Sequence, residues 1–356
     1  MLQHLYVPIE DVEKLERVVQ KLGYGSYSTI WLARDESSNE FVAIKICTAD
    51  PNPHEFDVLS NLSSPQLSGN SPGRSMVPLI LDSFQIQGPN GTHTCYVTSP
   101  ARMSLSDAKD GSYIRLFKLE VARVLAAQLA VAVEYIHTQG LAHGDLHSGN
   151  VLIQLPSGFN EMSDEELYKI YGEPESEVVT RFDGEELSPC IPSRAIIPVW
   201  LGEASEELQP SDAKIILSDF GEAFSPAKQD KFDPLFEGFL AKEDDMTCEH
   251  ADALGILPPE WWNKWDARHK KFSEDGKPIN RESYRSLEDR FEDSVQQPRR
   301  AEKMPPFEPA ERDALLSMLR SMLSFRPESR PSAKEVLASE WMVKWALPEY
   351  EKAQKS

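Results

Sequence analysis

The sequence has little cysteine, no long apolar run and a shortage of basic residues. Only four of its 356 residues are cysteines, and they lie far apart with no metal-ligand spacing: Cys47, Cys95, Cys190 and Cys248. Scattered reduced thiols are typical of cytoplasmic and nuclear proteins. No stretch reaches the ~18 apolar residues of a membrane span, and the N-terminus carries no basic region followed by an apolar run. We therefore expect a protein of the cytoplasm, the nucleus or both, neither secreted nor inserted in a membrane.

The shortage of basic residues leaves a strongly negative chain. It has 58 acidic residues against 37 lysines and arginines, which gives a formal net charge of −21. Nucleic-acid binding needs a basic face, so we expect no direct contact with nucleic acid. A basic protein partner would be attracted, although an excess of acid also simply keeps a protein soluble. We expect the protein to be a monomer.

The beginning of the chain is rich in predicted strands. Alternating apolar residues predict three twisted antiparallel strands within Glu16–Ile46. Two further apolar runs, Met76–Phe84 and Thr94–Val97, predict strands on either side of the turn Gly88–Gly91.

The rest of the chain is rich in predicted helices. A short helix is expected at His54–Leu62, and apolar residues at helical spacing predict a long one over Phe117–Gln139. Helical spacing recurs past Glu311 and again in Ser332–Trp341. Strands first and helices later predict an α+β fold with a small antiparallel β lobe and a larger, mainly helical lobe.

The segment Pro156–Ser211 differs in composition from both parts. It holds ten acidic residues between Glu161 and Glu186 against two basic ones. Ser163, with Glu166 three residues later, forms a capping box that predicts a helix over Ser163–Tyr171. We interpret the segment as an insertion on the surface rather than a separate domain.

Two stretches near the N-terminus suit phosphate binding. Gly23 and Gly25 stand at a predicted strand turn, where glycines let backbone amides approach phosphates closely. A Gly-x-Gly pair also marks ordinary hairpins, so this motif alone is weak. Lys45 ends Val-Ala-Ile-Lys on the predicted third strand, where it either points inward at phosphates or is exposed. The two motifs together are moderately specific.

A third stretch carries carboxylates and an amide at the spacing of a phosphoryl-transfer site. In His143-Gly-Asp-Leu-His-Ser-Gly-Asn150, Asp145 can accept a proton from an attacking hydroxyl, and Asn150 can reach a metal. Asp219 follows the apolar run Ile215–Leu217 in Asp-Phe-Gly and can bridge Mg²⁺ to a nucleotide. This combination is very specific.

These motifs resemble those of eukaryotic protein kinases, and specifically the SR-protein kinases in their fungal forms. The similar strings are KLGYGSYSTIWLARD, in which Ser28 replaces a third glycine, SDFGEAF, and FRPESRPSAKEVLASEWM. The resemblance covers Leu15 to Met342 apart from 156–211. It implies a bilobal protein-kinase fold, ATP and Mg²⁺ as cofactors, and a basic Ser/Arg-rich protein as substrate. Its lobes would be 15–98 and 99–346, between an N-terminal extension, 1–14, and a tail, 347–356.

The resemblance also implies a role for each matching residue. Asp145 would be the catalytic base, assisted by Lys45 on the α- and β-phosphates, while Asn150 and Asp219 would bind Mg²⁺. Glu55 would pair with Lys45, although it follows after only ten residues, a shorter gap than is usual in the family. The other nucleotide contacts would come from the glycine loop, the adenine pocket and the hinge Ser99–Ala101: Gly23, Gly25, Ser28, Ile30, Ala43, Ser99, Ala101 and Leu152.

Two departures from the family pattern affect the functional prediction. Gly144 replaces the arginine that would grip an activation-loop phosphate, and His147 replaces a lysine. Regulation by that phosphorylation is therefore not expected. The string HGDLHSGN also occurs in small-molecule kinases of the choline and aminoglycoside type, which gives an alternative function.

A third departure is a gap after Asp-Phe-Gly. Pro258-Pro-Glu260 can be taken as the end of the activation segment, or Leu235–Gly238 can be taken as a later part of the lobe; we prefer the second. In either case no Asp-x-Trp motif of the usual buried helix follows between 222 and 310. We predict a deletion near 225–235, an intact ATP site and a damaged platform for peptide substrate. An active kinase and a pseudokinase-like nucleotide-binding protein both stay open.

Overall fold

The computed structural model describes residues 16–35, 37–49, 54–64, 71–188, 191–227, 243–279 and 286–355. They divide into two compact units. The first comprises the described residues of Met1–Gly111, His143–Glu203 and Asp212–Phe224, and the second those of Ser112–Ala142, Ala204–Ser211 and Ser225–Ser356. Within the described part of the chain, no helix is long and apolar enough to cross a membrane. The lobe boundary at 98/99 stays a prediction.

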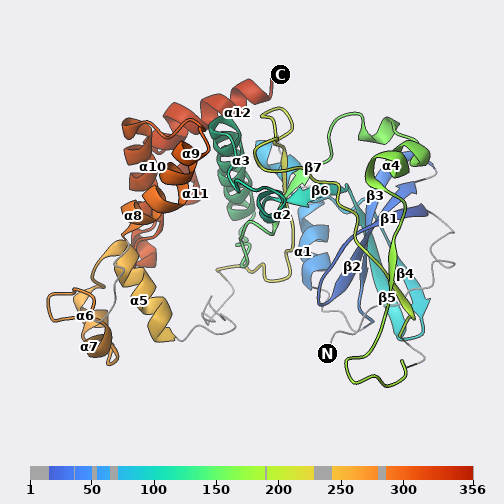
Figure 1. The fold of residues 1–356 in the computed structure, drawn as a ribbon, viewed down its shortest axis with the longest axis horizontal. Coiled ribbons are helices and arrows are strands. Elements are labelled where there is room, and N and C mark those ends of the chain that lie inside the picture. The colour runs from blue at the N-terminus through green and yellow to red at the C-terminus, as the bar shows by residue number, and fades with distance from the viewer. Residues whose placement is uncertain are drawn as a thin grey trace. The chain divides into compact units, whose positions relative to one another are not determined.

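A five-stranded antiparallel sheet forms the main layer of the first unit (Figure 1), in the order β1-β2-β3-β5-β4. Its strands are β1 (Glu16–Tyr24), β2 (Ser28–Asp35), β3 (Glu40–Cys47), β4 (Asp82–Gly88) and β5 (Gly91–Thr98). Side chains alternate across a strand, so Val42 and Ile44 share one face of β3 and Phe41, Ala43 and Lys45 share the other. Both faces are largely buried, because different layers cover them.

Smaller elements complete the first unit. Besides the main sheet it contains a three-stranded sheet in the order β10-β7-β6, a two-stranded one and three helices. The three α-helices are α1 (His54–Leu62), α2 (Leu105–Asp110) and α4 (Asp164–Tyr171), and two short 3₁₀ helices are labelled η3 (Pro72–Met76) and η4 (Phe159–Glu161). The strands are β6 (Ala101–Ser104), β7 (Val151–Gln154), β8 (Ser176–Val178), β9 (Arg194–Ile196) and β10 (Ile215–Leu217). Because β7 and β10 are hydrogen-bonded neighbours, the segment between them leaves and re-enters the three-stranded sheet at adjacent points.

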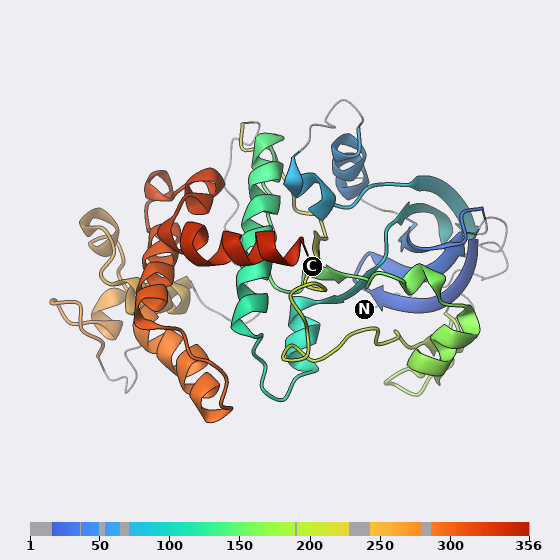
Figure 2. The same cartoon turned by 90° about the horizontal axis from the view of Figure 1, so that it is seen from above.

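The acidic insertion packs on the face of the main sheet that carries Phe41. Phe159, Leu167 and Leu201 are fully or almost fully buried against Phe41 and its neighbours on the sheet. Helix α4 lies beside β1 and β3 (Figure 1, Figure 2). The Phe41 and Phe159 rings meet edge-on, 5.1 Å apart. The insertion therefore contributes to the core of the first unit, while its assignment as a surface insertion stays a prediction.

An ion-pair cluster centred on Asp164 fastens the insertion to the sheet. The Asp164 carboxylate lies 3.2 Å from Arg34 Nε and 2.5 Å from Arg17 Nη2. Arg34 also donates a 2.6 Å hydrogen bond to the Met162 carbonyl, and its guanidinium stacks 3.9 Å from the Phe41 ring centroid. Arg34 and Asp164 are both buried, so each depends on the other to offset its loss of hydration.

We expect Asp164→Asn to destabilise the protein by about 2 kcal/mol, because it keeps the shape of the side chain but leaves Arg34 buried without a carboxylate. The free energy of unfolding from urea titration measures the effect. Asp183→Asn is the matched control, since Asp183 also pairs with an arginine but is exposed, and it should change nothing measurable. Equal stability of the two variants would contradict the fastening role of Asp164.

The second unit is helical. Its described α-helices are α3 (Leu119–Thr138), α5 (Glu243–Leu254), α6 (Pro259–Trp262), α7 (Arg268–Lys271), α8 (Leu287–Phe291), α9 (Gln297–Ala301), α10 (Pro309–Met322), α11 (Ala333–Leu337) and α12 (Leu347–Ala353). Between them lie the π-helical turns η5 (Glu292–Gln296) and η7 (Met342–Ala346) and the 3₁₀ helix η6 (Pro327–Ser329). The C-terminal helix crosses α3 (Figure 2), and a buried cluster around Ala127, Ala314 and Trp341 joins the long helices. Arg123 forms a bidentate pair with the buried Glu311 at 2.8 and 2.6 Å, which ties α3 to α10.

Most predicted elements are present, with one correction. The helix at His54–Leu62 and the capping box of Ser163 with Glu166 are confirmed. The strand predicted over Met76–Phe84 is wrong in its first half: Pro72–Met76 is a 3₁₀ turn, and the strand is Asp82–Gly88. Pro78 has no N–H to donate to a neighbouring strand, so sheet pairing begins only near Leu81.

Candidate active site

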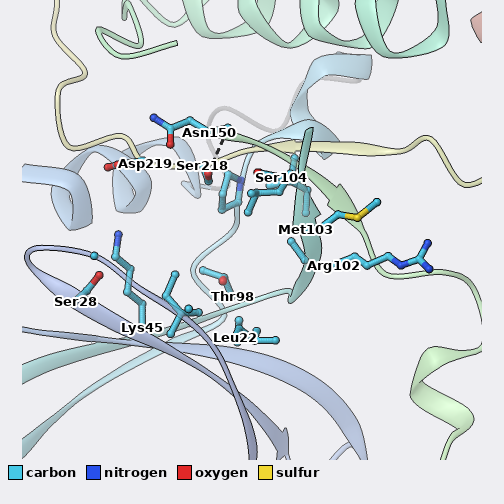
Figure 3. Close-up of a pocket in the computed structure, with 18 of the residues that line it drawn as sticks. Leu22, Ser28, Lys45, Thr98, Arg102, Met103, Ser104, Asn150, Ser218 and Asp219 are labelled. Atoms are coloured by element: carbon cyan, nitrogen blue, oxygen red, sulfur yellow. Dashed lines mark hydrogen bonds between the residues drawn. The ribbon is translucent and has the colours of Figure 1, made fainter. Parts of the chain in front are cut away.

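A cavity of about 560 Å³ lies within the first unit (Figure 3). It is lined by all but one of the residues predicted for the site: Gly23, Gly25, Ser28, Ile30, Ala43, Lys45, Glu55, Ser99, Ala101, Asn150, Leu152 and Asp219. The exception is Asp145, which does not belong to the cavity wall. Segments that are distant in the sequence thus meet in one space, because strands β1, β2, β3, β6 and β7, helix α1 and the loops next to them converge there.

The lysine of β3 is paired inside the cavity. Lys45 Nζ lies 2.5 Å from Glu55 Oε2 on α1, and both side chains are mostly buried. The short gap between the two residues therefore does not prevent the predicted pairing. Lys45 also lies 5.7 Å from the centroid of the Tyr96 ring. Burial, together with the nearby Glu55 carboxylate, strongly raises the pKa of Tyr96, which keeps its phenol neutral.

The loop before β7 holds a carboxylate at a fixed orientation. Asn150 Nδ2 donates to the Asp145 backbone carbonyl at 3.0 Å and to its Oδ2 at 3.2 Å. His147 Nε2 lies 3.5 Å from the same oxygen, and His147 Nδ1 accepts from the Gly149 amide at 3.0 Å. About half of the Asp145 side chain is exposed. Its carboxylate is thus positioned from within the loop and open to an incoming hydroxyl.

The segment after β10 presents Asp219 to the cavity in an unusual backbone conformation. Asp219 has φ +60°, a left-handed value that costs energy for a residue with a side chain. The next residue, Phe220, is completely buried and its ring packs 4.8 Å from the ring of His143. His143 Nε2 donates to the Ser218 carbonyl at 3.0 Å. Burial lowers the pKa of His143, so the neutral ring buttresses the segment that carries Asp219.

The side-chain oxygens of Asn150 and Asp219 suit a divalent metal whose other ligands are phosphate oxygens. Figure 3 shows Asn150 and Asp219 at the end of the cavity toward which Lys45 points. Because the Asn150 side chain uses its Nδ2–H to hold Asp145, its side-chain oxygen Oδ1 is left to act as a metal ligand. The described residues contain no cluster of three or more metal-binding side chains. Mg²⁺ accepts such sparse sites, since it is usually bound by one or two carboxylates plus substrate phosphates.

Helix α1 is joined to the segment after Asp219. His54 Nε2 lies 2.5 Å from the Ala223 carbonyl, and Ala223 is buried. Glu55 follows His54 at the start of the helix, so this contact also fixes the residue that holds Lys45.

The glycine that replaces the family arginine is required by its surroundings. Gly144 has φ +84°, and a Cβ atom at this position would overlap the backbone carbonyl of Glu222. The chain therefore packs closely against the segment after Asp-Phe-Gly at the point where an arginine was expected.

The predicted deletion cannot be placed on the structure. Leu235–Gly238 and most of 225–235 lie outside the described residues. In the second unit, Glu260 pairs with Arg326, whereas Arg330 donates to the Ser324 carbonyl at 2.8 Å. Glu260, the glutamate of Pro258-Pro-Glu260, is thus paired with Arg326 rather than with Arg330. The deletion stays a prediction.

Several cavity residues were missed by sequence reasoning. They are side chains next to the motifs or on the return path of the insertion: Leu22, Tyr96, Thr98, Arg102, Met103, Asp107, Pro198, Val199, Trp200, Ile216 and Ser218. The residues beside a motif could have been found from the strand period. No signal in the sequence marks Pro198–Trp200, because the acidic insertion has no counterpart in the family motifs.

The fold is that of a protein kinase domain. The family described as protein kinase domain matches residues 17–182. A solved kinase-domain crystal structure is matched with a TM-score of 0.58 over 96% of this chain and 99% of that one, at 14% sequence identity, which shows the fold. The chain has the fold of a protein kinase domain, and residues 17–182 are similar to that family, whose members use ATP and a divalent metal, usually Mg²⁺.

Over part of its length the chain is similar to serine/threonine-protein kinases, SR-protein kinases among them. It is 31% identical over 144 residues to the serine/threonine-protein kinase SRPK of Physarum polycephalum, covering 38% of this chain and 33% of that protein. Over 145 residues it is 30% identical to the kinase SKY1 of Saccharomyces cerevisiae, covering 39% and 20%. A serine/threonine protein kinase of Aspergillus fumigatus is 32% identical over 124 residues, covering 35% and 31%. The matched region thus spans about a third or less of these relatives' length.

Proposed function

We propose that the chain is an ATP- and Mg²⁺-dependent serine/threonine protein kinase that phosphorylates serines in basic Arg/Ser-rich proteins. The observation that carries the proposal is the pairing of Lys45 with Glu55 in the cavity that Asn150 and Asp219 also line. Phosphoryl transfer in kinases depends mainly on positioning and electrostatic stabilisation, and these are the side chains that supply both.

Each residue has a separate task in this mechanism. Lys45, oriented by Glu55, neutralises charge on the α- and β-phosphates, and the glycine turn at Gly23 and Gly25 covers the phosphates with backbone amides. Asn150 and Asp219 would hold Mg²⁺, which would supply positive charge next to the phosphate oxygens. Asp145 accepts the proton of the attacking serine hydroxyl, and Asn150 keeps its carboxylate aimed.

The charge of the chain supports a basic substrate. The net charge of −21 attracts arginine-rich peptides. The similarity to a kinase named SRPK supports the same substrate class. We propose Arg-Ser repeat peptide as the acceptor for a first assay.

We expect Lys45→Ala to weaken Mg-ATP binding roughly tenfold or more, because it removes a charged contact to phosphate and leaves Glu55 unpaired in the cavity. Isothermal titration with Mg-ATP measures the effect. Lys214→Ala is the control, since Lys214 is an exposed lysine of the same unit, just before β10. If both variants bound Mg-ATP as the unaltered protein does, the phosphate end of the site would be wrongly assigned.

A second candidate function follows from the loop 143–150. His147 lies 3.5 Å from Asp145 where protein kinases have lysine, and Gly144 excludes their arginine. Both features favour a small-molecule phosphotransferase of the choline or aminoglycoside type. Parallel assays with an Arg-Ser peptide, choline and an aminoglycoside distinguish the two functions. Mg-ATP binding without transfer to any acceptor would instead favour a pseudokinase-like nucleotide-binding protein.

A further inference from the structure

The end of the acidic insertion forms part of the cavity wall. Pro198, Val199 and Trp200 line the cavity together with Met103 and Arg102 of β6. Figure 3 shows Met103 and Arg102 at the opposite end of the cavity from Lys45 and Asp219. The insertion therefore contributes to the end of the site that lies away from the phosphate-binding residues.

Three polar contacts hold this segment across the cavity. The Val199 amide donates to the Lys21 carbonyl of β1 at 2.8 Å, directly before the glycine turn. Arg102 Nε donates to the Leu201 carbonyl at 2.7 Å, and Arg102 Nη1 lies 3.0 Å from Glu203. Leu201 is almost completely buried. The segment is thus hydrogen-bonded to β1 through Val199 and to β6 through Leu201. Trp200 lies between these two residues in the chain.

Trp200 combines a supported ring with an exposed surface. The indole lies against the backbone of Gly111 and Gly202, where a Cβ atom at Gly111 would be only 3.0 Å from Trp200 Cζ2. Because neither glycine has a side chain, there is room for the Cζ2–Cη2 edge of the ring beside them. Even so, 48% of the residue stays exposed in a cavity-lining position. An aromatic side chain that is fixed on one side and open on the other is suited to stack on a planar ligand.

We propose that Trp200 is a nucleoside-binding residue, which contacts the base and ribose of the nucleotide rather than its phosphates. The proposal rests on the proposed function, since it requires the cavity to bind ATP. The arrangement of the cavity supports the proposal. Lys45 and Asp219 lie at the phosphate end, so the nucleoside half extends toward Met103 at the other end (Figure 3). Trp200 lies beside Met103, since a Cβ atom at Gly202 would meet both side chains. The insertion would then complete the binding site as well as covering the sheet.

The test compares adenosine with Mg-ATP by isothermal titration of the full chain. Trp200→Ala is expected to weaken both ligands about tenfold, within the range for aromatic stacking on a base. Lys45→Ala is expected to weaken Mg-ATP and leave adenosine unchanged. Trp261→Ala is the matched control, because Trp261 is also a partly exposed tryptophan but lies in the second unit, outside the cavity.

The outcomes separate this proposal from the proposed function. An adenosine affinity that stays within twofold in Trp200→Ala would overturn the role of Trp200 while leaving the phosphate site intact. An Mg-ATP affinity that stays within twofold in Lys45→Ala would overturn the phosphate site instead.

A second measurement covers the case in which Trp200→Ala fails to fold. Trp200→Phe keeps a ring on Gly111 and Gly202. Adenosine should change the tryptophan fluorescence of the unaltered protein, and Trp200→Phe should lose at least half of that change. The same fluorescence change in both proteins would overturn the proposal.

Discussion

Asp145→Asn is expected to lower the rate of phosphate transfer to an Arg-Ser repeat peptide by about 10³-fold, since a positioned general base contributes roughly 10²–10⁴-fold. An amide cannot take the proton of the serine hydroxyl. It can still accept the hydrogen bond from Asn150, so the loop should keep its shape. Radiometric transfer of the γ-phosphate measures the rate.

Binding of Mg-ATP is the internal control for this variant. Asp145 does not line the cavity, so affinity should stay within about threefold of the unaltered protein, a difference below 1 kcal/mol. Asp275→Asn, an exposed carboxylate of the second unit, should leave the rate unchanged. A rate in Asp145→Asn above a tenth of the normal value would rule out Asp145 as the base.

The second large effect is on stability. Gly144→Ala is expected to lower the free energy of unfolding by about 3–5 kcal/mol, because it combines backbone strain with overpacking against a fixed carbonyl. The φ of Gly144 is +84°, and the added Cβ would overlap the Glu222 carbonyl. Urea unfolding followed by circular dichroism measures the loss.

Gly140→Ala separates the two contributions at Gly144. Gly140 also has a left-handed φ, +73°, but a Cβ there would meet nothing within 4 Å. It should cost only about 1 kcal/mol, the strain of the backbone alone. If Gly144→Ala cost no more than Gly140→Ala, the close packing against Glu222 would be disproved. An arginine at 144 brings the same Cβ, so restoring the family residue should not be tolerated either.

Local patterns accounted for much of the fold. The helix at His54–Leu62 and the capping box of Ser163 with Glu166 depend on residues a few positions apart, and both are observed as predicted. The predicted start of a strand at Met76 is wrong, because an apolar run does not reveal whether its backbone amides can bond to a neighbouring strand. Pro78 has no amide N–H to donate.

The sequence predicted the cavity residues that belong to phosphoryl-transfer motifs. Lys45, Asn150 and Asp219 stand in strings whose residue types and spacing point to phosphoryl transfer, and all three line one cavity. Trp200 could not be predicted. Its place depends on where Arg102 and Lys21 hold the insertion, and these contacts join residues far apart in the chain. The same applies to Phe159 and Leu167, which are buried apolar residues within an acidic segment.

The attachment of the insertion to the sheet also sets a limit on the order of folding. The bonds from Arg34 to Asp164, from Tyr168 to Val19 and from Gln20 to Gly172 span 130, 149 and 152 residues. During synthesis, β1 to β3 therefore leave the ribosome long before the residues that cover Phe41. The face of these strands that carries Phe41 stays uncovered at least until Gly172 has emerged. The sheet must be protected from other chains during that interval.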